Sequence, residues 1–141
     1  MAQSLGFGGI QIHVAHGFLL SQFLSPLFNK REDGYGGSIK SRMRLLIDVI
    51  DEVRNAVDRH FPIAVKLNAS NQLEGGFEEL EALEVVSALE VVSALDTTCI
   101  DLIDISGGTY FPCASSASDR AASGPYFSIS RSVLESKLTN Y

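Results

Sequence analysis

The chain has 141 residues, of which 45% are hydrophobic and 20% are charged, and its formal net charge is −6. This composition is ordinary for a globular protein of single-domain length. The negative charge argues against a nucleic-acid partner and against binding to an anionic membrane surface. No segment reaches the roughly 18–20 consecutive apolar residues of a membrane span, so the sequence predicts none.

The first residues and the cysteines indicate the compartment. Met1–Leu5 lacks the basic region that opens a signal peptide. Two cysteines in an otherwise ordinary chain are typical of a reducing environment without a disulfide framework. We therefore expect a cytoplasmic protein.

The first half of the chain predicts a strand, a loop and a helix. Apolar and polar residues alternate up to Val14, which predicts a strand over about residues 8–14. A long polar loop, Gly17–Gly37, follows. Apolar residues then recur at helical spacing and predict a helix over about Ile39–Arg59, with Ser38 as its N-cap.

The second half repeats this alternation. We expect a strand at Ile63–Leu67, a helix at about Phe77–Leu95, a strand at Ile100–Ser106 and a last helical segment at about Tyr126–Lys137. Strands that alternate with helices predict parallel βαβ units with the helices outside. Long loops follow the strands and shorter ones precede them, as on the functional face of a βα barrel or an open doubly wound sheet.

One helix contains a direct repeat. Glu84–Leu89 is followed at once by the identical Glu90–Leu95. Six residues turn an α-helix by about 600°, so an inserted copy rotates the downstream apolar stripe by about 240°. We interpret the repeat as a recent duplication or a gene-model error, and expect a bulge or a protruding turn.

Two histidines mark a candidate site. His13 and His16 end the first strand, where α/β proteins place ligands. Two neutral imidazoles can both donate to one ligand oxygen, and would polarise a carbonyl, a nitro group or a phenolate. Two unrelated histidines are one alternative and zinc is another. For zinc, no Asp, Glu or Cys nearby completes a tetrahedral set, and Cys99 and Cys113 lie far along the chain.

The sequence around these histidines resembles the old yellow enzyme family, flavin-dependent ene-reductases related to NADH:flavin oxidoreductases. Residues 6–20, GFGGIQIHVAHGFLL, look like the fourth strand of that family and its loop. The resemblance covers about residues 4–112. Its other segments are Gln22–Pro26, Asn29–Asp33, Tyr35–Ser38, Val65–Asn68, Gly75–Phe77 and Asp104–Tyr110.

The resemblance implies a fold and a cofactor. The family fold is an eight-stranded (β/α) barrel with FMN at the carboxyl ends of the strands, and a complete barrel takes about 250 residues. Residues 1–141 would form a single partial TIM-barrel domain of about three βα units, an internal fragment with the fourth to sixth strands. Most contacts with FMN would then lie elsewhere in the barrel.

The resemblance also assigns roles to residues. His13 and His16 match the pair that hydrogen-bonds the electron-withdrawing oxygen of the substrate. Lys66 takes the place of a basic residue, often arginine, whose charge stabilises reduced flavin near N1 and O2. Phe18 departs from the family, in which many members have a tyrosine that protonates the α-carbon. That step would need water or another group here.

The charged motif before the first long helix has a structural interpretation. We expect Arg31, Asp33, Tyr35 and Arg42 to fix the loop by salt bridges more than to shape the mouth of the site.

These inferences support an FMN-dependent NAD(P)H oxidoreductase of the ene-reductase type, acting on a small molecule with an activated C=C bond or on a quinone. A homo-oligomer is compatible with the resemblance for the full-length protein. The alternative is a non-catalytic, truncated remnant without turnover. A third, weaker hypothesis is a metal-dependent (β/α) enzyme that uses the two histidines.

Overall fold

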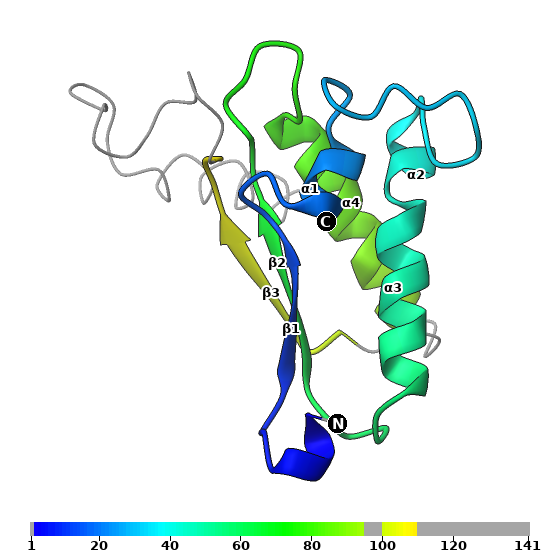
Figure 1. Ribbon diagram of the computed structural model, residues 1–141, viewed down its shortest axis with the longest axis vertical. Coiled ribbons are helices and arrows are strands. Elements are labelled where there is room, and N and C mark those ends of the chain that lie inside the picture. Colours follow the sequence, from blue (N-terminus) through cyan, green and yellow to red (C-terminus); the bar gives the residue numbers. More distant parts are fainter. Residues whose placement is uncertain (1, 95–99, 110–141) are drawn as a thin grey trace, which may run out of the picture.

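The computed structural model describes residues 2–94 and 100–109 (Figure 1). Within them, three parallel strands form one sheet in the order β1-β2-β3. The strands are β1 (Ile10–Val14), β2 (Ile63–Asn68) and β3 (Leu102–Ser106). The parallel sheet agrees with three βα units of a (β/α) barrel. The last helical segment that the sequence predicts lies outside the described residues.

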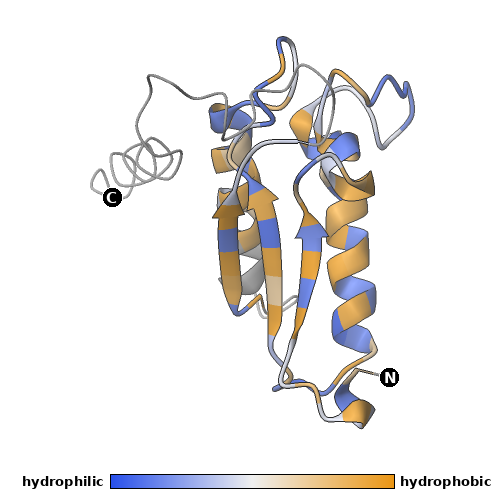
Figure 2. Ribbon diagram, turned by 60° about the vertical axis from the view of Figure 1, so that its left-hand side comes forward, coloured by the Kyte–Doolittle hydropathy of each residue, from blue (hydrophilic) through white to orange (hydrophobic). Residues whose placement is uncertain are grey.

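The helices cover one face of this sheet (Figures 1 and 2). Within the described part of the chain, no helix is long and apolar enough to cross a membrane. The helices are α1 (Leu19–Leu24), α2 (Ile39–Arg42), α3 (Arg44–Asn55) and α4 (Glu79–Ala94), and a 3-10 helix spans Gln3–Leu5.

Alternation along the strands separates a core face from an open face. Side chains of a strand point alternately to its two sides, and Figure 2 shows hydrophilic and hydrophobic bands in turn along the strands. The core face of β2 contributes Ile63, Val65 and Leu67, all fully buried. They pack against residues of α3 and α4 that include Ile50 and Leu89. The opposite face carries the polar residues of the candidate site.

The structure corrects the predicted loop and the predicted first helix. The segment Gly17–Gly37 contains α1, which has no side-chain N-cap and therefore gives no start signal. Ser38 does cap the next helix, because its side chain accepts from the Ser41 amide. That helix is divided at Met43 into α2 and α3.

The second of these helices, α3, ends earlier than its apolar pattern predicts. It stops at Asn55 instead of Arg59. The Arg54 guanidinium donates to the carbonyl oxygens of Asp58, Arg59 and Phe61. These bonds hold the chain in a turn that leads directly into β2.

The bulge expected from the repeated hexapeptide is not found in α4, which runs without interruption from Glu79 to Ala94. Backbone hydrogen bonding in a helix does not depend on which side chains face the sheet, so a repeat can extend a helix without distorting it. The first copy contributes to the core, since Val85 and Leu89 are fully buried.

Candidate active site

A row of three polar residues crosses the open face of the sheet. The strand register places His13 beside Lys66 and Lys66 beside Asp104. Lys66 Nζ lies 2.9 Å from Asp104 Oδ2, and Gln11 Nε2 donates to the same oxygen at 3.4 Å. The ammonium group of Lys66 is therefore already paired. Sequence reasoning missed Asp104: strand alternation places it on the same face as Ser106, but only the register of the folded sheet places it next to Lys66.

The structure brings the two predicted histidines together. The ring centroids of His13 and His16 are 5.3 Å apart, with the rings inclined at 62°. His16 follows the strand in a left-handed conformation, with φ 60°, and pairs with Thr109 in an isolated parallel bridge. This turn carries the His16 ring over the carboxyl end of the sheet. The half-exposed ring of Phe18 lies 5.0 Å from the His13 ring.

A serine that the sequence interpretation gave no role holds His16. Ser106 ends β3, and its Oγ lies 2.8 Å from His16 Nε2. Burial lowers the pKa of His16 below its usual 6.5, and the charges of His13 and Lys66 lower it further, whereas Asp104 raises it. The His16 ring is therefore neutral near pH 7 and carries a single N–H.

Asn68 ends β2 on the same side as Lys66 and is almost fully buried. Its Nδ2 donates to the carbonyl oxygen of Gly108 at 2.8 Å, which fixes the orientation of the amide. Its Oδ1 is buried, and within the described residues it has no hydrogen-bond partner. Such an acceptor is ready for a donor group of a ligand. A polar residue at the end of an otherwise apolar strand was the available sequence signal.

The charged motif after β1 has the structural role that the sequence indicates. Arg42 is buried and donates to the carbonyl oxygens of Leu24 and Gly37 and to the carboxylate of Glu81. It thus ties α1, the loop and α4 together.

The exposed part of the same loop is held by local pairs. Arg31 forms an ion pair with Asp33 and, by hydrogen bonding, lowers the pKa of that carboxyl to about 2. The hydroxyl group of Tyr35 donates to Asp48 at 2.9 Å. These contacts connect the loop to itself and to α3, not to the row with Lys66.

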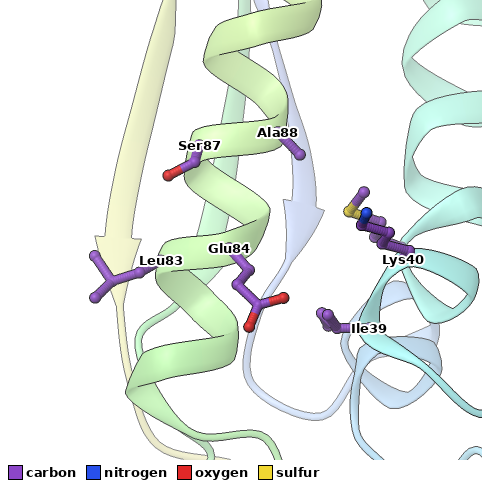
Figure 3. A pocket seen from close by; sticks show the side chains of 7 residues that line it. Ile39, Lys40, Leu83, Glu84, Ser87 and Ala88 are labelled. Carbon is purple, nitrogen blue, oxygen red and sulfur yellow. The ribbon is translucent and has the colours of Figure 1, made fainter.

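A separate groove lies in the helix layer, between α2 and α4 (Figure 3). Ile39 and Met43 line one side, and Leu83 and Ala88 line the other. It lies across the sheet from Lys66 and is not part of the candidate site. Within residues 2–94 and 100–109, no three His, Cys, Asp or Glu residues are grouped as a metal site. Cys99 and Cys113 are outside these residues.

Residues 1–130 match the family model described as NADH:flavin oxidoreductase / NADH oxidase. The chain belongs to this family. The NADPH dehydrogenase of Halalkalibacterium halodurans is 40% identical to it over 111 residues, which is 79% of this chain and 30% of that protein. The chain thus spans about 30% of the length of this curated relative.

Solved structures of old yellow enzymes share the fold. The old yellow enzyme from a Pichia species superimposes with a TM-score of 0.64 at 35% identity, over 74% of this chain and 28% of that one. The homologue from Zymomonas mobilis gives a TM-score of 0.61 at 30% identity, over 79% of this chain and 30% of that one. The sheet described here is therefore part of an old yellow enzyme (β/α) barrel fold.

Membership of this flavin-dependent family implies a flavin, and the open face fits part of an isoalloxazine ring. That ring presents several nitrogen and oxygen acceptors and one N–H donor. Lys66 offers a charged donor, and the buried Oδ1 of Asn68 offers an acceptor. Lys66 is a point charge where a guanidinium would give a planar fork, so bidentate pairing is not available.

Proposed function

We propose that this chain carries part of the active site of an FMN-dependent NAD(P)H oxidoreductase that reduces quinones or activated alkenes. Bound FMN, once reduced by NAD(P)H, would supply the hydride. The observation that carries the proposal is the position of His13, His16 and Lys66 on one open face, at the carboxyl end of a parallel sheet. Family membership and the old yellow enzyme fold support it.

In this proposal His13 and His16 bind the acceptor through its oxygen atom. Two N–H groups directed at one oxygen stabilise the negative charge that develops there during reduction. With their centroids 5.3 Å apart, the two rings are close enough for one N–H group of each to reach the same oxygen atom beside the pair. Loss of one such donor typically lowers turnover by about 100- to 1000-fold.

Lys66 would hold the flavin and stabilise the charge of its reduced form. Its ion pair with Asp104 reduces the net charge at this position to about zero. Lys66 would therefore bind through a directed hydrogen bond more than through an unscreened positive field.

Phe18 favours quinones over alkenes as the acceptor. Reduction of an alkene requires a proton on carbon, and phenylalanine has none to give. Reduction of a quinone requires protons only on oxygen, which exchange readily with water. The Phe18 ring lies against His13, so it forms an apolar wall at this point.

Titration of the full chain with FMN tests the proposal. We expect quenching of flavin fluorescence and a yellow complex. Lys66→Gln should weaken binding roughly 10- to 150-fold, since a hydrogen bond to a charged group is worth about 1.5–3 kcal/mol. Lys66→Arg should bind as the parent does, and Lys40→Gln, on α2, is the matched control. Absence of binding at tens of micromolar FMN would exclude flavin chemistry by this chain alone.

A further inference from the structure

We propose that Ser106 is a positioning residue that keeps the proton of the His16 ring on Nδ1, so that Nδ1 is the atom that His16 offers to the acceptor's oxygen. This inference rests on the proposed function, because it identifies the donor atom of the histidine pair. It follows from the hydrogen bond between Ser106 and His16 and from the way in which both residues are fixed.

Both partners of that bond are held by the end of β3. Ser106 is buried, pairs with Asn68 in the sheet, and accepts the Ala69 amide on its carbonyl oxygen at 2.8 Å. The backbone of His16 pairs with Thr109, three residues beyond Ser106. The backbones of both residues are thus held in place where Ser106 Oγ and His16 Nε2 meet at 2.8 Å.

A neutral imidazole in this bond has two arrangements. When Nε2 donates to the serine oxygen, Nδ1 carries only a lone pair, which repels a negatively charged oxygen. When the serine hydroxyl donates to Nε2, the ring proton is on Nδ1, which becomes a donor. Only the second arrangement lets His16 act with His13 on one oxygen.

A doubly protonated His16 ring, which would donate from both nitrogens, is disfavoured by the groups around it. Burial and the neighbouring charges of His13 and Lys66 lower the pKa of His16. Near neutral pH the ring therefore has one proton, and a hydroxyl group that donates to Nε2 keeps that proton on Nδ1. Ser106 is the residue that the structure places at Nε2.

Long-range ¹H–¹⁵N correlation spectra of the full chain, labelled in its histidines, report the tautomer directly and need no turnover. The chain has three histidines, and His16→Gln identifies the signals of His16. We expect Nδ1–H for His16 in the parent chain. Ser106→Ala should move the proton to Nε2, while Ser106→Thr, which keeps a hydroxyl group, should leave it on Nδ1.

An Nε2–H signal for His16 in the parent chain would overturn the inference, as would an Nδ1–H signal that survives in Ser106→Ala. Circular dichroism checks that the variants are folded. If Ser106→Ala is unfolded, the parent chain and Ser106→Thr still test the inference, because it requires Nδ1–H on His16 in both.

FMN titration of the same samples separates the two proposals. A chain that shows Nδ1–H but binds no FMN overturns the proposed function and retains the tautomer. A chain that binds FMN with Nε2–H on His16 overturns only the inference about Ser106.

Discussion

Several charged groups of the site act on the pKa of His16. The charges of His13 and Lys66 lower its pKa, and the carboxylate of Asp104 raises it. We predict that Lys66→Met raises the pKa of His16, because a positive neighbour is removed, and that Asp104→Asn lowers it further. Titration of the His16 ring signals by NMR measures both shifts. Lys40→Met is the control for loss of a lysine elsewhere.

Shifts of the same sign in the two variants would contradict this account. They would show that the charges on β2 and β3 do not act on His16 separately. Absence of a shift in both variants would show that burial, the largest cause of the lowered pKa, acts without these two charges.

Phe18 allows a direct test of acceptor preference. Its ring is half exposed, so a hydroxyl group can be added without burying it. We predict that Phe18→Tyr raises the rate of alkene reduction by about 100-fold relative to quinone reduction, the lower end of the effect of a general acid. Steady-state rates with an enone and a quinone measure the ratio. Phe28→Tyr, also in the exposed part of this region, is the control. An equal change for both acceptors would mean that the new hydroxyl does not protonate carbon.

At the scale of elements, Arg42 joins three pieces of the chain. It is buried and bonds to the end of α1, to the loop before α2 and to Glu81 of α4. Arg42→Met removes the buried partner of a pair whose other member, Glu81, is partly exposed, so we expect a cost of about 2–3 kcal/mol, below the roughly 3–5 kcal/mol of a fully buried pair. Urea unfolding measures the loss, and Lys40→Met, at an exposed position of α2, is the control. A loss of less than about 1 kcal/mol would show that the loop does not depend on this tie.

Helix α4 provides a matched pair of leucines. Leu89 is 1% exposed and packs in the core, whereas Leu80 is 63% exposed. We predict that Leu89→Ala costs about 2–5 kcal/mol of unfolding free energy and that Leu80→Ala costs less than about 0.5 kcal/mol. Thermal and urea unfolding compare the two. Equal losses would mean that α4 does not contact the sheet through the first copy of the repeat.

The elements that sequence predicted correctly have strong periodicity. The three strands and the body of α3 bury a regular apolar face, and that pattern is visible locally. Helix α4 differs, because apolar residues lie on all its sides and its helix-forming composition identifies it instead. Helix α1 was not predicted, because it has only six residues and no capping side chain. The break at Met43 leaves the apolar spacing intact, so periodicity alone cannot show it.

The same distinction applies to the site. His13 and His16 are three residues apart, so their proximity follows from local geometry. Ser106 is 90 residues from His16 in sequence, and Asp104 is 38 residues from Lys66. Their contacts depend on the register of β3 against its neighbours, which composition and spacing do not specify.

At the scale of the whole molecule, the residues that stabilise the fold and the residues of the candidate site lie on opposite faces of the sheet. Its buried face and the helices form the core, while the polar row and the histidines lie on the other face. Substitutions on the open face should therefore change ligand binding with little effect on unfolding. Substitutions in the core should lower the free energy of unfolding with little direct effect on ligand binding.

The open face and the strand edges also make self-association an expected property of the chain. Within the described residues, β1 and β3 each pair with one strand only, and Leu102 on β3 is 60% exposed. Unpaired strand edges beside exposed apolar residues favour pairing with another chain. The net charge of −6 opposes contact between copies, and salt screens that repulsion. We therefore predict association that increases with protein concentration and with salt, measured by sedimentation velocity.

Leu102→Asp should weaken this association, because it adds a charge to the exposed edge strand. Leu80→Asp is the control, since Leu80 is equally exposed but lies on α4. If both variants sediment as the parent does, the strand edge and the face beside it are not the surfaces that meet. A monomer at every salt concentration would show that the strand edges do not attract one another, because salt would have screened the repulsion of the negative charge.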